Sequence, residues 1–155
     1  MKKILFICHG NICRSTMAES VFTWLVEKRG VSHMFEISSA GTSDEEEGNP
    51  VHHGTRAKLG IEGIPVVPHK ARQLVYADAE KYDYFIGMDS YNISNIKFIL
   101  RDKASDVKIC RLLDFSQYPG DIADPWYTGN FDDTFRDVLE GCEALLDYCL
   151  KQKLG

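Results

Sequence analysis

Long apolar segments and an excess of basic residues are both missing from this sequence. No run approaches the roughly 18 apolar residues of a membrane span, and the apolar residues 4–8 are too few for a secretory signal, so we expect a cytoplasmic protein without a membrane span. The 18 basic residues are outnumbered by 23 acidic ones, which gives a net charge of −5. This balance argues against a protein that binds nucleic acid by neutralising its phosphates, but it is compatible with a local positive site.

A disulfide framework is also lacking. The five cysteines are odd in number, and in the expected reducing compartment they are thiols, so a cysteine in an unusual setting is a candidate for chemistry. The 155 residues, of which 44% are hydrophobic and 26% charged, are typical of one domain that buries its core without disulfides or a structural metal. We therefore expect a single domain over residues 1–155, with a monomer as the favoured oligomeric state.

The order of strand and helix patterns indicates the fold class. Strand patterns cover residues 3–8, 35–39, 84–88 and 107–112. Helical patterns begin at residue 15 or 16, which follows the first strand closely, and then cover residues 52–59, 90–100 and 131–153. Residues 114–130, rich in proline and glycine, are predicted to be a long loop. Strands that alternate with helices predict an open parallel α/β sheet with helices on both faces.

The polar segment after the first strand carries the clearest chemical signal. Cys8 ends the strand and Arg14 follows six positions later, at the start of a helix. Backbone N–H groups of such a loop can converge on an oxyanion, and Arg14 adds a permanently charged, forked donor. This positive environment should favour the thiolate of Cys8 at neutral pH. Gly10 and Asn11 suit unusual loop dihedrals, and Ser15 is expected either to cap the helix or to hydrogen-bond the thiolate.

A thiolate that attacks phosphorus also needs an acid that protonates the leaving oxygen. Asp124 is the best candidate, since ligands bind beyond the carboxyl ends of parallel strands and Pro125 stiffens the loop around it. The alternative role for Asp124 is a turn residue before the proline. Trp126 and Tyr127 follow directly and are expected to form the wall of a cleft for an aromatic leaving group.

Several motifs together resemble the low-molecular-weight protein tyrosine phosphatase family over essentially the whole chain. They are the Cys-x5-Arg-Ser loop from Cys8, Ser-Ala-Gly-Thr at residues 39–42, His-Lys-Ala-Arg at 69–72, the stretch from Tyr-Asp at 82–83 to Met-Asp at 88–89, and Asp-Pro at 124–125. The resemblance implies a four-stranded parallel sheet, with a phosphate-binding loop between the first strand and the first helix. It also implies the hydrolysis of a phosphotyrosine-containing protein or an aryl phosphate, with no metal and no organic cofactor.

The resemblance also implies roles for individual residues. Cys8 would form a cysteinyl-phosphate intermediate, Arg14 would clamp the phosphate, and Asp124 would act first as a general acid and then as a general base. The phosphate would be bound by consecutive loop residues, namely His9, Gly10, Asn11, Ile12, Cys13, Arg14 and Ser15. A supporting hydrogen-bond network would include Asn11, Ser15, Ser39 and His69.

Two positions near the expected site affect specificity. Family members commonly carry a tyrosine where this chain has Trp126, and His9 is a polar residue that should face the substrate entrance. Both are expected to change which substrates fit and to leave the chemistry intact.

Alternatives to a phosphatase and to a catalytic Cys8 remain at this point. An arsenate reductase on the same scaffold would need a close pair of cysteines near residues 75–95, but there is no cysteine between Cys13 and Cys110. A catalytically silent phosphopeptide-binding module would keep the anion pocket. Cys8 and Cys13 are also not spaced like zinc ligands. Cys13 is a candidate redox partner that would trap oxidised Cys8 as a disulfide.

Overall fold

Four parallel strands form the centre of the protein, in the order β2-β1-β3-β4. The computed structural model describes residues 1–154, and the side chains of residues 1–151. The strands are β1 (Lys2–Cys8), β2 (Phe35–Gly41), β3 (Tyr84–Gly87) and β4 (Lys108–Arg111). The predicted four-stranded parallel sheet is therefore confirmed, although β2 continues to residue 41, beyond its predicted end.

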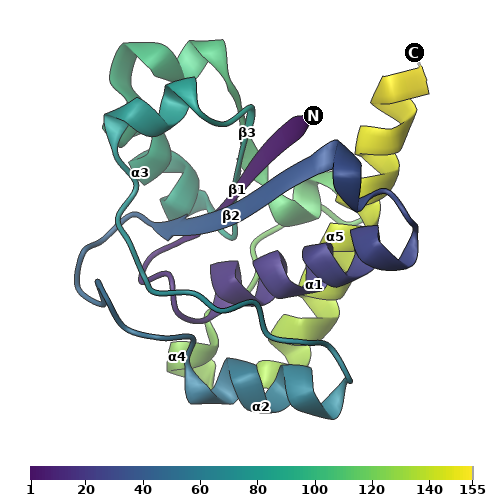
Figure 1. Cartoon of the computed structure of the whole chain (residues 1–155). Helices are drawn as coiled ribbons and strands as arrows, with labels where there is room; N and C mark the ends of the chain where they lie inside the picture. The colour runs from purple at the N-terminus through teal and green to yellow at the C-terminus, as the bar shows by residue number, and fades with distance from the viewer. Residues whose placement is uncertain (155) are drawn as a thin grey trace.

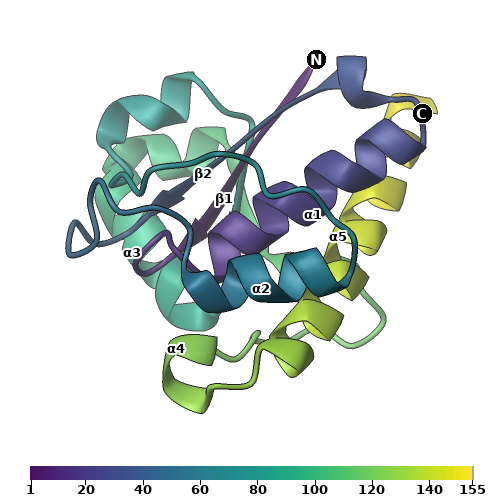
Figure 2. The same cartoon turned by 60° about the horizontal axis from the view of Figure 1, so that its bottom comes forward.

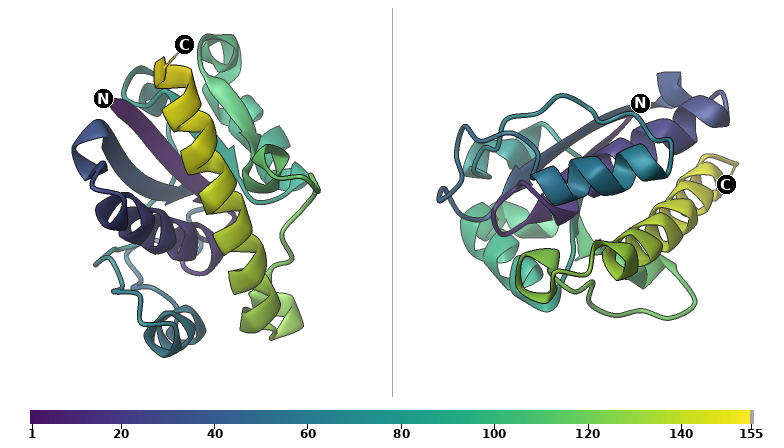
Figure 3. Two further views of the ribbon diagram at one scale, coloured as in Figure 1. Left: turned by 90° about the vertical axis from the view of Figure 1, so that its right-hand side faces the viewer. Right: turned by 90° about the horizontal axis from the view of Figure 1, so that it is seen from below.

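Helices cover both faces of this sheet, as predicted (Figures 1 and 2). Helices α1 (Arg14–Lys28) and α5 (Phe131–Leu154) lie side by side on one face, and α3 (Ser90–Leu100) lies on the other. Figure 3 shows α5 running along the length of the sheet. Strand β1 serves both cores, because Ile4 and Phe6 pack with α1 and α5 whereas Leu5 and Ile7 pack with α3. Burial on both faces explains the continuous apolar sequence of this strand.

Two further helices lie near the carboxyl ends of the strands, α2 (His53–Ile61) and α4 (Pro125–Thr128). Short 3-10 helices connect other elements, namely η1 (Ser32–Met34), η2 (Tyr76–Glu80), η3 (Arg101–Asp106) and η4 (Leu112–Phe115). The prediction of a continuous loop over residues 114–130 was wrong at α4. This single turn has proline at its first position and ends at Gly129, where φ is 69°. Four residues are too few for a helical period, so only the caps signal it.

The strand order places a binding site at the end of β1. The chain passes from β1 through α1 to β2 on one side, and β3 then pairs with β1 on the other side. In open parallel sheets this change of direction opens a crevice beyond the strand ends. None of the helices within residues 1–154 is both long and apolar enough to cross a membrane. Cytoplasmic location and a monomeric state stay predictions.

Candidate active site

The Cys8 thiol lies at the base of a surface pocket, at the carboxyl end of β1. Its side chain is buried, and the residue is only 3% exposed. The Sγ atom is 3.0 Å from Ser15 Oγ and accepts a hydrogen bond from the backbone N–H of Asn11 at 3.3 Å. The pocket is lined by Cys8, His9, Gly10, Ile12, Cys13, Glu45, Glu46, Asp124, Trp126 and Tyr127.

The loop after Cys8 has a sharply turned backbone, because Asn11 has a φ of 60°. Asparagine tolerates this left-handed conformation better than most residues. The end of β2 packs closely against the loop. A Cβ atom on Gly41 would lie 2.8 Å from the carbonyl oxygen of His9, so only glycine fits at that position. The backbone N–H groups of Thr42 and Ser43 donate to the carbonyl oxygens of Cys8 and His9, both at 3.0 Å.

The side-chain amide of Asn11 connects the loop to the neighbouring segments. Its Nδ2 donates to Ser15 Oγ at 2.9 Å and to Ser39 Oγ at 3.1 Å. Its Oδ1 accepts from His69 Nε2 at 2.7 Å and from the backbone N–H of Arg72 at 3.0 Å. All four hydrogen-bonding positions of the amide are used, so the turned loop is held from both sides. The four residues expected to form a network, Asn11, Ser15, Ser39 and His69, are thus brought together.

The direction of these bonds determines what Ser15 donates to. Ser15 Oγ already accepts a hydrogen bond from Asn11 Nδ2, so its own hydroxyl proton is available to Cys8 Sγ. Cys8 Sγ is therefore held by hydrogen bonds from the Ser15 hydroxyl and the Asn11 backbone N–H. Of the two roles expected for Ser15, the structure shows this one, because Cys13 occupies the N-cap of α1 and Ser15 lies in its first turn.

Glu19 extends the network behind the loop. This carboxyl is 5% exposed, accepts a hydrogen bond from Ser39 Oγ, and has Oε1 3.7 Å from His69 Nδ1. Burial raises the pKa of Glu19 to about 7. The His69 Nε2–H donates to Asn11, so its other ring nitrogen, Nδ1, faces Glu19. Burial lowers the pKa of His69, and Arg72 lowers it further, so an uncharged ring lies beside Glu19 at neutral pH.

Arg14 is buried among oxygen atoms at the start of α1. Its Nη1 donates to Asp89 Oδ2 at 2.7 Å and to the carbonyl oxygen of Ile122 at 2.8 Å, and its Nη2 lies 3.4 Å from Asp124 Oδ2. Within the described part of the chain, the buried Nε of Arg14 has no hydrogen-bond partner. A buried donor without a partner is costly, and an oxyanion would satisfy it. Asp89 and Asp124 therefore flank the positive charge of Arg14.

Asp124 lines the pocket and contacts the same guanidinium. Its Oδ1 accepts from the backbone N–H of Trp126 at 3.0 Å and so caps α4, while Oδ2 points to Arg14. Asp124 therefore both caps the turn before Trp126 and lies beside Arg14. Trp126 and Tyr127 form the outer wall of the pocket, with exposed fractions of 54% and 83%.

The opposite rim of the pocket is acidic. Glu45 and Glu46 line it, and His9 Nε2 lies 3.4 Å from Glu45 Oε2. His9 and Glu45 are both well exposed, so this contact contributes little to stability. The position of His9 agrees with the expectation that it faces the entrance.

The site combines a buried thiol, a turned loop of N–H donors, a buried arginine and a facing carboxyl. Comparison with known sequences is decisive, because the profile described as low molecular weight phosphotyrosine protein phosphatase matches residues 3–154. The chain belongs to this family. The chain is thus a low-molecular-weight protein-tyrosine phosphatase, a hydrolase.

The similarity to known proteins covers nearly the whole phosphatase chain. This chain is 40% identical over 155 residues to the low-molecular-weight protein-tyrosine-phosphatase YfkJ of Bacillus subtilis strain 168, with 99% of both chains covered. The crystal structure of YfkJ superimposes with a TM-score of 0.92, covering 99% of this chain and 97% of the other. A structure described as a drosophila arginine phosphatase has a TM-score of 0.86 at 28% identity, with 96% and 97% covered.

The second thiol of the phosphatase loop, Cys13, differs in character from Cys8. Burial, followed by the nearby Cys8 and Asp124, raises the pKa of Cys13 to about 12. Cys13 is therefore a protonated thiol at neutral pH, although it lines the same pocket. Its backbone carbonyl oxygen accepts a hydrogen bond from Thr55 Oγ1 at 3.3 Å, which fixes this part of the loop to α2.

Three residues of the phosphatase site were given no role from the sequence. Asp89 follows β3, the strand beside β1, so the rule that ligands bind at carboxyl ends of strands could have indicated it. Glu19 gave no signal, because a glutamate within a helix is usually solvated. Arg72 stands in a recognised motif, but its roles are the backbone bond to Asn11 and an ion pair with the buried Asp78.

Proposed function

We propose that the phosphatase hydrolyses phosphotyrosine in proteins through a cysteinyl-phosphate intermediate on Cys8. In the first step, the Cys8 thiolate attacks phosphorus, the bond between phosphorus and the phenolic oxygen breaks, and Asp124 gives its proton to that oxygen. In the second step, Asp124 takes a proton from water, the water oxygen attacks phosphorus, and the P–S bond breaks. Inorganic phosphate leaves and the Cys8 thiolate is restored.

One observation supports this proposal above the others. The Cys8 sulfur accepts hydrogen bonds beside a buried arginine whose Nε lacks a partner in the described residues. Arg14 Nε and the loop N–H groups are oriented before any substrate arrives, so they can stabilise the phosphoryl oxygens as charge develops on them. In this mechanism Arg14 clamps the phosphate, and residues 9–15 surround it.

The depth of the pocket supports an aryl substrate. Cys8 lies at the base, whereas Trp126 and Tyr127 rise at the rim and are largely exposed. A phosphoryl group on a long aromatic side chain reaches such a base, while the short side chain of phosphoserine does not. The two rings offer apolar faces against which a tyrosine ring can pack.

The decisive experiment measures turnover of a phosphotyrosine peptide by the purified protein. Cys8→Ser should abolish turnover, and Asp124→Ala should leave a slow enzyme from which phosphocysteine is recovered after acid quench. Cys110→Ser is the matched control, because Cys110 lies on β4, outside the pocket, and should turn over substrate normally. An active Cys8→Ser enzyme would disprove the covalent mechanism.

The same preparation tests the alternative functions. A silent phosphopeptide-binding module would bind the peptide without releasing phosphate. An arsenate reductase would consume a thiol reductant when arsenate is added, yet Cys142 and Cys149 are fully buried in the core and poorly placed for a thiol relay. Phosphoarginine is the third substrate to compare, since one structural relative is described as an arginine phosphatase. We expect phosphotyrosine to be the preferred substrate.

A further inference from the structure

His52 connects the phosphate-binding loop to helix α2. Its backbone N–H donates to the carbonyl oxygen of Ile12 at 2.9 Å, inside the loop. Its side chain caps α2, because Nδ1 accepts from the backbone N–H of Gly54 at 3.0 Å. Through these two bonds, the position of the His52 ring is fixed relative to the loop that holds Cys8.

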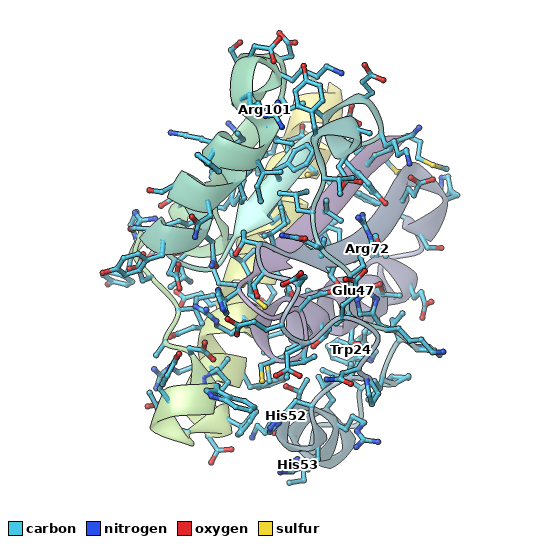
Figure 4. The ribbon with its side chains drawn as sticks, turned by 90° about the vertical axis from the view of Figure 1, so that its left-hand side faces the viewer. Trp24, Glu47, His52, His53, Arg72 and Arg101 are labelled. Carbon is cyan, nitrogen blue, oxygen red and sulfur yellow. The ribbon has the colours of Figure 1, made fainter. Side chains whose placement is uncertain are left out.

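The same ring contacts the segment that carries the acid. It is stacked on Phe131, the first residue of α5, with ring centroids 5.5 Å apart and planes at 14°. It meets Trp126 edge-on at 5.7 Å and 73°. Figure 4 shows His52 between the start of α2 and α4. Gly54, the next residue but one, also packs closely on Phe131, because a Cβ atom on it would lie 2.3 Å from Cζ of that ring.

Helix α4 needs such contacts to hold its place. It has only four residues, and a helix this short is not stable by itself. The contacts that hold it include the buried Pro125, the Asp124 carboxyl, which caps α4 and pairs with Arg14, and the edge of Trp126 against His52. Two residues therefore connect this segment to the phosphate-binding loop: Arg14 contacts the Asp124 carboxyl, and His52 contacts the Trp126 ring.

We propose that His52 is a positioning residue, whose ring sets the place of α4 and so of the Asp124 carboxyl relative to Cys8. The proposal rests on the proposed function of Asp124 as the acid. His52 does not line the pocket, so it acts through Trp126 and not on the substrate. Proton transfer depends steeply on the distance between the acid and the leaving oxygen. A small shift of α4 should therefore weaken acid catalysis while the attack by Cys8 continues.

The protonation state of the ring agrees with this role. Nδ1 must be unprotonated to accept from Gly54. Burial lowers the pKa of His52, and the neighbouring His53 and Arg56 lower it further. The acidic groups that face it, Glu46 and Asp124, act in the opposite direction and are outweighed. The ring is neutral at neutral pH, so the cap and the stacking persist together.

Two substitutions separate the ring from the cap. His52→Asn keeps an acceptor for the Gly54 N–H but removes the ring, whereas His52→Phe keeps a ring and removes the acceptor. The backbone bond to Ile12 is available in both variants. The measurement is kcat/KM for a series of aryl phosphates whose leaving groups differ in pKa, with Asp124→Asn as the reference that lacks the acid.

Loss of acid catalysis should appear as a steeper dependence of kcat/KM on the pKa of the leaving group. We expect His52→Asn to lose about tenfold in kcat/KM for phenyl phosphate and little for p-nitrophenyl phosphate, because the better leaving group needs less protonation. His52→Phe should restore the shallow dependence of the original enzyme. An unchanged dependence in His52→Asn, or one that is equally steep in both variants, would overturn the proposal.

Fluorescence gives a readout that does not depend on activity. The chain has two tryptophans, and in a Trp24→Phe background Trp126 is the only one left. Iodide should quench Trp126 more strongly when His52→Asn is added, and not when His52→Phe is added. Equal quenching in all three proteins would refute the positioning role. If Asp124→Asn keeps the shallow leaving-group dependence, the acid assignment fails instead, and the quenching result still decides whether His52 holds α4.

Discussion

Replacing Asp89 by asparagine should show how much the site depends on a carboxylate outside the pocket-forming loop. Asp89 lies just beyond the carboxyl end of β3, and its two oxygens have separate tasks. Oδ2 accepts from Arg14 Nη1 at 2.7 Å, while Oδ1 accepts from the backbone N–H of Asn92 at 2.8 Å and caps α3. The side chain of Arg14 is 3% exposed and that of Asp89 is 17% exposed, so solvent screens this pair weakly.

The structure sets the expected magnitude. Asparagine has one acceptor oxygen, so it can bind Arg14 or cap α3, but not both. Loss of a hydrogen bond to a charged group costs about 1.5–3 kcal/mol, and a buried arginine left with less compensation adds to that cost. We expect Asp89→Asn to lower the free energy of unfolding by about 2–3 kcal/mol. For a chain of this size that corresponds to a fall of about 4–12 °C in Tm.

Activity should fall together with stability, because the guanidinium loses the anchor that orients it. We expect kcat/KM for an aryl phosphate to drop about 10- to 100-fold, measured well below the Tm of the variant. Asp147→Asn is the control, since Asp147 forms an exposed ion pair with Arg29 and should change neither quantity measurably. An Asp89→Asn protein with unchanged Tm and kcat/KM would refute this account of Arg14.

Three further substitutions test other parts of the site. Because burial raises the pKa of Glu19 to about 7, the free energy of unfolding should fall by up to about 3 kcal/mol as pH rises from about 4.5 to 7; chemical denaturation across pH should show this decline, and Glu19→Gln should abolish it. Peroxide should oxidise Cys8 to a sulfenic acid that condenses with the Cys13 thiol, releasing water and forming a disulfide, which thiol mapping should find. In the Cys13→Ser variant, the activity that peroxide treatment removes should not return when a reductant is added. Asp124→Asn should bind inorganic phosphate several-fold more tightly at pH 7, measured by calorimetry, and weaker binding would contradict the charge argument.

Most of the fold could be predicted from the sequence because its strong signals are local. The continuous apolar residues of β1 indicate burial on both faces, and that burial is what the two cores show. The helix predicted over residues 90–100 has those bounds in the structure. Helix α4 was missed, since a single turn has no periodicity and depends on its caps and on contacts with distant residues.

The candidate site could be predicted where its residues are neighbours in sequence. Cys8, Asn11 and Arg14 belong to one loop, so their spacing already indicates an anion pocket. Asp89 could not be connected to Arg14 in this way, because 75 residues separate them and only the parallel pairing of β1 with β3 brings them together. The same holds for Glu19, which is buried only because the segments around residues 39 and 69 fold over it.

The charge of the site has a consequence for the proposed mechanism. Arg14 is already compensated by Asp89 and Asp124, and the rim adds Glu45 and Glu46, so a doubly negative phosphoryl group does not enter a strongly positive pocket. An ionised Asp124 would lie beside the incoming charge and oppose binding. A protonated Asp124 removes this repulsion and is also the form that can protonate the leaving oxygen. In the proposed mechanism, Asp124 therefore carries a proton when the substrate is bound, and the carboxylate left by the first step accepts the proton of water in the second.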